Sequence, residues 1–120
     1  MYLAIATRPD IAFAVNKVAW FVERPSNIHW NAVKRIMRYL RRTTNYGLIY
    51  YRKQDEDSNL IAYCDSDWAG DFDDRKSTTR YVMKFSNGTV SWKSSKQTCV
   101  AQSTGEAEYV AAATAAKEVI

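Results

Sequence analysis

Residues 62–70, which read AYCDSDWAG, decide how the rest of the chain is interpreted. They continue the short apolar and partly aromatic run 60–64, whose length and polar flanks are typical of a buried β-strand. Side chains alternate along a strand, so Asp65 and Asp67 share one face if the extended backbone continues. Two carboxylates on one face repel each other unless a cation lies between them. The stretch therefore predicts either a pair of metal ligands or, more simply, a polar strand end that runs into an acidic loop.

A helix with a second candidate metal ligand is predicted near the C-terminus. Residues 103–106, STGE, form a capping-box pattern, in which the Ser and Glu side chains accept hydrogen bonds from N–H groups at the helix start. Glu108 follows within this helix and is predicted to lie on its apolar stripe with Ala111, Ala112 and Ala115. An acid on such a packing face is unfavourable unless a cation compensates it. A metal ion shared by Asp65 and Glu108 would supply that cation.

Two amphipathic helices are predicted in the N-terminal half. The first begins at residues 7–9, with Pro9 near the first helical position, and ends before Pro25. The second begins after Ser26, a favourable N-cap. His29, in the first turn of the second helix, has no other His or Cys at ligand spacing, so we expect it to pack or to cap. The short connection predicts an antiparallel helical hairpin.

Basic residues gather on the faces of the second helix that are not apolar. They are Lys34, Arg38, Arg41 and Arg42. Phosphate groups require only Lys and Arg, so these residues are candidate nucleic-acid contacts; the simpler alternative is a solvated surface. The whole chain has 17 Lys and Arg against 13 Asp and Glu, with a pI near 9.1, which mildly favours a polyanionic partner.

The second half is predicted to form an antiparallel sheet followed by the Glu108 helix. A strand-like segment at 48–52 comes after Gly47 and before a polar loop. Two more segments, 80–85 and 89–93, are joined by an Asn-Gly pair, which is a strong hairpin signal. With the strand at 60–64, this hairpin predicts three antiparallel strands and one helix.

Several motifs in a fixed order resemble the ribonuclease H domain of copia-type LTR retrotransposon Pol polyproteins. They are AYCDSDWAGD, DDRKSTT, VSWKSSKQ and STGEAEYVAAA, and the upstream segments ATRPDIAFAVN and HWNAVKRIMRYLRRT resemble the C-terminal segment of the reverse transcriptase. The resemblance covers nearly the whole chain. It implies an α+β fold with a connection-like helical segment at 1–53 and a truncated ribonuclease H-like half at 60–120, separated by the polar loop at 54–59.

The resemblance also implies a chemistry, which is two-metal hydrolysis of the RNA strand of RNA·DNA hybrids with Mg²⁺ as cofactor. By motif, Asp65 and Glu108 are the catalytic metal ligands and Asp67 is a weaker third ligand. Arg80 departs from the family pattern, which favours Gly there. The family's remaining acids would lie beyond Ile120, so we expect Mg²⁺ to be held weakly or not at all and the isolated chain to be inactive. The expected partners are the hybrid or the rest of the polymerase, in the cytoplasm or nucleus.

A second, weaker resemblance concerns the tetrapeptide RYLR, formed by Arg38, Tyr39, Leu40 and Arg41. It is similar to the RxLR translocation motif of oomycete secreted effectors, and this alternative implies a non-enzymatic protein that acts on host proteins inside plant cells. Leu40 also belongs to the apolar stripe, so packing explains it equally well. The first ten residues lack the length and layout of a signal peptide or a membrane span, and no membrane association is expected.

Overall fold

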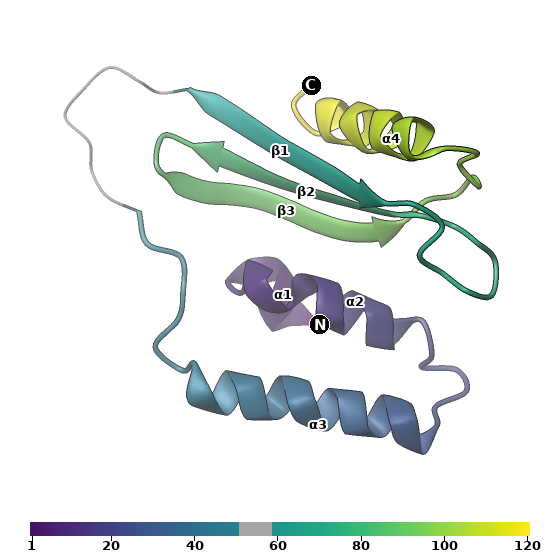
Figure 1. Ribbon diagram of the computed structural model, residues 1–120. Coiled ribbons are helices and arrows are strands. Elements are labelled where there is room, and N and C mark those ends of the chain that lie inside the picture. Colours follow the sequence, from purple (N-terminus) through teal and green to yellow (C-terminus); the bar gives the residue numbers. More distant parts are fainter. Residues whose placement is uncertain (51–58) are drawn as a thin grey trace. The chain divides into compact units, whose positions relative to one another are not determined.

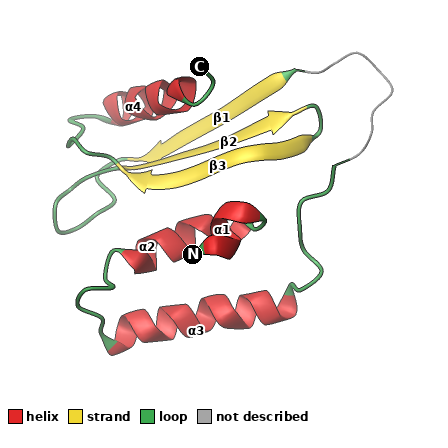
Figure 2. Ribbon diagram, turned by 180° about the vertical axis from the view of Figure 1, so that it is seen from behind, coloured by secondary structure: helices red, strands yellow, loops and turns green. Residues whose placement is uncertain are grey.

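The computed structural model describes residues 1–50 and 59–120, which form two compact units (Figure 1). The helical unit is Met1–Leu48 and the sheet unit is Ile49–Ile120. The elements in chain order are α1 (Tyr2–Ala6), the 3₁₀ turn η1 (Pro9–Ile11), α2 (Ala12–Ala19), α3 (Asn27–Arg42), β1 (Leu60–Asp67), β2 (Thr78–Phe85), β3 (Gly88–Lys96) and α4 (Thr104–Lys117). This content confirms the predicted α+β class (Figure 2). The predicted boundary loop at 54–59 lies almost entirely outside the described residues.

The first predicted helix is shorter and less regular than the sequence pattern indicated. α1 precedes it where no helix was predicted, and the chain from Pro9 makes a 3₁₀ turn before α2 begins. Proline suits this first turn because its fixed φ is already helical and its missing N–H is not needed there. α2 ends at Ala19, well before Pro25, since the chain bends to stack Phe21 on His29, with ring centroids 4.1 Å apart. The predicted single helix is therefore wrong in its extent.

α3 and the helical hairpin agree with the prediction. Ser26 is the N-cap of α3, and its backbone N–H donates to Nδ1 of His29 at 3.0 Å. The imidazole thus takes the place that Glu has in a capping box, and it also stacks on Phe21. The expectation that His29 packs or caps is confirmed. α2 and α3 run antiparallel beside each other (Figure 1).

Arg8 connects the start of this hairpin to its end. Its guanidinium is buried and donates from Nη1 to the Thr43 carbonyl at 3.0 Å and from Nη2 to the Thr43 hydroxyl at 2.7 Å. It also pairs with Asp10 at 2.7 Å, and the Tyr39 hydroxyl donates to the same carboxylate at 2.8 Å. The hydrogen bond from Arg8, with that from Tyr39, lowers the pKa of Asp10. The cluster joins the residues before α2 to the residue that ends α3.

Replacing Arg8 should loosen the helical unit more than replacing an exposed arginine. Arg8→Ala removes the donor of two buried hydrogen bonds to Thr43 and of the ion pair with Asp10, and the loss of buried hydrogen bonds is destabilising. We expect a melting temperature several degrees lower and faster hydrogen exchange at the C-terminal end of α3. Arg24→Ala, which removes the same charge from an exposed position, is the control. Equal effects of the two substitutions would contradict this role for Arg8.

The sheet unit is an antiparallel sheet in the order β1-β2-β3, covered on one face by α4 (Figure 1). The predicted hairpin is confirmed, and all three strands are longer than predicted. Tyr81 and Met83 of β2 are buried and form the core with Ala115 of α4. The amide of Gln97 ties the layers together, because its Nε2 donates to the Thr79 hydroxyl at 3.0 Å and to the Ala107 carbonyl at 2.9 Å.

The predicted strand at residues 48–52 is not present in its described part. Residues 48–50 are not in a strand, and residues 51 and 52 lie outside the described residues. The Tyr50 ring lies against Gly88, where a Cβ atom would collide with it, and its hydroxyl donates to the Thr89 carbonyl at 2.6 Å. The segment therefore packs at the β2–β3 hairpin, because the tyrosine finds an acceptor there. Among the described strands, β1 has a neighbour on one side only.

The acidic loop after β1 contains a buried ion pair. Asp71 is buried, and Lys96 of β3 donates to its Oδ2 at 2.9 Å and lies 2.8 Å from Oδ2 of Asp74. The Asp73 backbone N–H donates to Oδ1 of Asp71 at 2.9 Å. The Lys96 hydrogen bond, followed by this backbone hydrogen bond, lowers the pKa of Asp71 to about 2.

This lowered pKa predicts an acid-sensitive contribution to the stability of the sheet unit. The ordinary carboxyl pKa of 3.8 lies above the folded value of about 2, so the contribution is present above pH ~4 and disappears as the pH falls toward 2. Its size is on the order of 1–2 kcal/mol. Asp71→Asn should lower the free energy of unfolding at pH 7 and flatten its dependence on pH between ~4 and ~2. Chemical denaturation across this range is the measurement, and exposed Asp73→Asn is the control that should change neither quantity.

Candidate functional site

The two acids of the opening motif lie on one face of β1, as predicted. β1 continues to Asp67, and Asp65 is directly opposite Arg80 of β2. Nη1 of Arg80 is 3.5 Å from Oδ2 of Asp65, and Nη2 is 3.6 Å from Oδ2 of Asp67. The guanidinium thus reaches both carboxylates. The cation that two neighbouring acids require is an arginine side chain of the same sheet.

Asp67 also has a structural role that the sequence reasoning missed. Its Oδ1 accepts a hydrogen bond from the Thr78 backbone N–H, which joins the end of β1 to the start of β2. Its carboxylate lies against Gly70, where an added Cβ atom would be 2.8 Å from Cγ of Asp67. The indole of Trp68 donates to the Ala101 carbonyl at 3.0 Å. The motif therefore builds a turn as well as an acidic face, and Gly70 was the sequence signal for that turn.

Glu108 lies on an exposed part of α4. The buried stripe of α4 consists of Ala107, Ala111 and Ala115, so the prediction is right for Ala111 and Ala115 and wrong for Glu108 and Ala112, which are exposed. Residues four apart pack along one helix face, while Glu108 is about 100° away from Ala107 around the axis.

The face of the sheet that α4 covers is not the face that carries Asp65. Thr79, Tyr81 and Met83 of β2 are buried on the α4 side. Arg80 alternates with them and points to the other side, together with the carboxylates that it pairs with. The structure therefore brings Asp65 and Asp67 together with Arg80 and leaves Glu108 on another surface. A metal ion shared by Asp65 and Glu108 stays a prediction.

These side chains do not fit a two-metal centre. Across residues 1–50 and 59–120, no three His, Cys, Asp or Glu side chains stand together as a metal-ligand group. Mg²⁺ requires near-octahedral oxygen coordination, and two such ions need several shared carboxylates. Here two carboxylates share one positive side chain, which leaves a single net negative charge at the acidic face.

The basic residues of α3 form a coherent exposed face. Lys34, Arg38, Arg41 and Arg42 are all exposed and lie on the side opposite to the half-buried stripe of Val33, Ile36 and Leu40. We call these four residues the basic face. Residues 1–48 contain eight Lys and Arg against two Asp and Glu, so the helical unit is far more basic than the whole chain. Exposed Trp30 continues the basic face toward the start of α3, with Nζ of Lys34 at 5.8 Å from its ring centre.

The RYLR tetrapeptide lies within α3, where its two arginines are exposed and the Tyr39 side chain is partly exposed as well. Arg38 and Arg41 are exposed members of the basic face. The Tyr39 hydroxyl is bound to Asp10, and Leu40 is half-buried against the hairpin. A receptor that reads four extended residues would have to unfold this part of α3.

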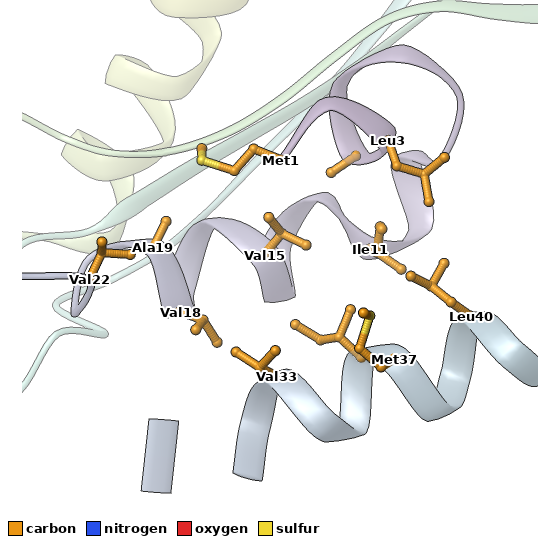
Figure 3. Close-up of a pocket in the computed structure, with 12 residues that line it drawn as sticks. Met1, Leu3, Ile11, Val15, Val18, Ala19, Val22, Val33, Met37 and Leu40 are labelled. Carbon is orange, nitrogen blue, oxygen red and sulfur yellow. The ribbon is translucent and has the colours of Figure 1, made fainter. Parts of the chain in front are cut away.

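An apolar groove of about 500 Å³ runs along the helical unit. Side chains of α2 and α3 point into it from both sides, including Val15, Val18, Val33 and Met37 (Figure 3). The predicted apolar stripes therefore face each other without filling the space between them.

No helix in the described part of the chain is long and apolar enough to cross a membrane.

Comparison with known proteins shows which proteins the sequence resembles. No family model matches the chain, and no solved structure does. The retrovirus-related Pol polyprotein from transposon TNT 1-94 of Nicotiana tabacum is 52% identical over 120 residues, which are all of this chain and 9% of that relative. The Pol polyprotein from transposon RE2 of Arabidopsis thaliana is 42% identical over 118 residues, 98% of this chain and 8% of that relative.

A relative that is not a Pol polyprotein is also similar along the whole chain. Secreted RxLR effector protein 161 of Plasmopara viticola is 45% identical over 120 residues, which are all of this chain and 83% of that relative. The chain thus spans less than a tenth of the two Pol polyproteins and most of the effector. The chain is therefore a homologue of the copia-type retrovirus-related Pol polyproteins over a small part of their length, and it belongs to one sequence family with the RxLR effector, most of which it spans.

Proposed function

We propose that the chain is a retroelement Pol fragment that binds nucleic acid through α3 and does not hydrolyse it by itself. The observation that carries this proposal is the exposed basic face, which lies opposite the apolar side of the helix. Lys34 to Arg42 extend over about 12 Å of helix, at 1.5 Å per residue. One strand of a B-form duplex presents a phosphate about every 3.4 Å of axis, and the A-form geometry of an RNA·DNA hybrid brings phosphates somewhat closer along the axis, so this length matches about four phosphates. The ligand we propose is an RNA·DNA hybrid.

The sheet unit is proposed to be the first half of a ribonuclease H-like domain. Three antiparallel strands followed by a helix, with Asp65 near the end of the first strand, support this assignment. When bound in a complete domain of this class, Mg²⁺ would activate water for hydrolysis of the RNA strand. In this chain Asp65 and Asp67 instead hold Arg80, and Glu108 lies on a different surface. Further acids from the rest of a polymerase would be needed for hydrolysis.

Binding through the basic face should depend steeply on salt. Four phosphate contacts give a slope of log affinity against log salt of about −3 to −4, because each contact releases condensed counterions. Replacing the four residues by Gln should flatten this slope and weaken binding at low salt. Fluorescence anisotropy with a labelled RNA·DNA hybrid at several salt concentrations is the measurement, and we expect the hybrid to be recovered uncleaved in Mg²⁺.

The control for this experiment removes four basic residues from the sheet unit. They are Arg75, Lys84, Lys93 and Lys117, each replaced by Gln. The net charge of the chain falls equally in both variants. Only the variant of the basic face should show a flatter dependence of log affinity on log salt concentration. Equal losses would mean that overall charge drives the association and that the basic face is ordinary surface.

The second candidate function is that of a secreted effector acting on host proteins. The observation that favours it is the 45% identity over most of the length of an RxLR effector, together with the exposure of Arg38 and Arg41. The structure restricts how such a motif acts, because Tyr39 and Leu40 are occupied by contacts inside the helical unit. A receptor that binds the folded protein would contact the two arginines and the exposed part of Tyr39.

Export distinguishes the two candidate functions. Arg38→Ala with Arg41→Ala and the control pair Lys34→Ala with Arg42→Ala remove equal charge from the same exposed face. If the chain acts as a retroelement fragment, the tagged protein stays in the producing cell, and both pairs weaken hybrid binding to a similar degree. Secretion, followed by host-cell entry that only the first pair abolishes, would establish the effector function in its place.

A further inference from the structure

We propose that Arg80 is the built-in cation of the Asp65–Asp67 pair and keeps divalent metal ions away from it. The motif that resembles a metal site is, in this chain, an internal ion-pair cluster. The inference concerns the acidic face of β1 alone and does not depend on nucleic-acid binding by α3.

The position of Arg80 follows from the pairing of two strands. Asp65 and Asp67 are two residues apart on β1, so their side chains project from the same face. β2 pairs with β1 in a register that sets Arg80 directly across from Asp65. From there Nη1 approaches Asp65 at 3.5 Å and Nη2 approaches Asp67 at 3.6 Å. A planar guanidinium with two separate terminal nitrogens suits two acceptors in this way, whereas an ammonium is a single point charge.

A metal ion and this guanidinium would compete for the same oxygens. Mg²⁺ and Mn²⁺ bind through one or two carboxylates and fill their other positions with water, so two acids on one face are a minimal site. With Arg80 in place, Oδ2 of each carboxylate already faces a positive nitrogen. Oδ1 of Asp67 is also engaged, because it accepts the Thr78 N–H. A divalent ion at this site would therefore have to displace the guanidinium, or it would bind more weakly because the two positive charges repel each other.

The cluster lies at the surface, so replacing Arg80 should make the two carboxylates accessible without creating a cavity in the core. The side chain of Arg80 is 40% exposed, and that of Asp65 is 66% exposed. Removing the guanidinium therefore uncovers two neighbouring carboxylates that solvent and ions can reach. Their mutual repulsion is then relieved by whatever cation is present.

The test measures Mn²⁺ binding to the full chain, using paramagnetic broadening of backbone amide signals and the electron paramagnetic resonance of free Mn²⁺. Arg80→Gln is the principal variant. Lys84→Gln, on the same strand and the same face four residues along, removes an equal charge and is the matched control. Arg80→Gln combined with Asp65→Asn shows whether a new site uses Asp65.

We expect Arg80→Gln to bind Mn²⁺ at least about tenfold more tightly than the unaltered chain, since a charge only a few ångströms away is removed. This increase in Mn²⁺ affinity should be absent in Lys84→Gln, and it should disappear when Asp65→Asn is added to Arg80→Gln. Equal affinity of Arg80→Gln and the unaltered chain would overturn the proposal, as would a gain that survives Asp65→Asn.

A measurement on the unaltered chain keeps the proposal testable if Arg80→Gln does not fold. In the unaltered chain, Mn²⁺ should broaden the amides of Asp65 and Asp67 no more than that of Glu108, a solitary exposed acid. Preferential broadening at the β1 pair would show that metal binds despite Arg80 and would refute the inference. Arg80→Lys retains the charge and should bind Mn²⁺ more weakly than Arg80→Gln if both fold.

Discussion

The register in which β1 pairs with β2 governs the chemistry of the acidic stretch, because it sets Asp65 directly across from Arg80. Alternation then sends Asp65, Asp67 and Arg80 to one face of the sheet, while Thr79, Tyr81 and Met83 go to the face that α4 covers. A shift of one residue would exchange these sets and bury charge under the helix. The packing of α4 and the ion pairs of the acidic face are thus two consequences of one pairing.

The helical unit depends on a different kind of constraint. Its helices α2 and α3 meet along apolar stripes that leave a groove of about 500 Å³, so packing alone does not close the unit. Buried Arg8 connects the start of α2 to Thr43 after α3, and the stacking of Phe21 on His29 connects the other end of the hairpin. Because these contacts use the inner side of the unit, the four cations of the basic face remain exposed to solvent.

The two units therefore differ in the charges that they present to a partner. The helical unit has a surface of one charge sign that suits a polyanion of any sequence. The sheet unit has two pairs of acids, and in each pair one basic side chain balances half of the negative charge: Arg80 faces Asp65 and Asp67, and Lys96 faces Asp71 and Asp74. The Pol polyproteins that this chain resembles are more than ten times as long, so most of their length lies outside the comparison.

The sequence by itself determined the elements whose signals are local. The Asn-Gly hairpin, the Ser26 cap and the strand at residues 60–64 each follow from residues that lie within a few positions of one another, and the structure contains all of them. The shared face of Asp65 and Asp67 was predictable for the same reason. Motif order along the chain was enough to indicate the family.

Tertiary structure alone decided which residues meet. The sequence does not show that Arg80 lies across from Asp65, that Arg8 reaches Thr43, or that Tyr50 packs on Gly88, because these contacts depend on strand register and on how the chain folds back. The position of Glu108 was mispredicted for a related reason: a rotation of one residue around α4 separates the buried stripe from the exposed side, and only packing against β2 selects the rotation. Local spacing defines a helix face, whereas the partner surface determines which face is buried.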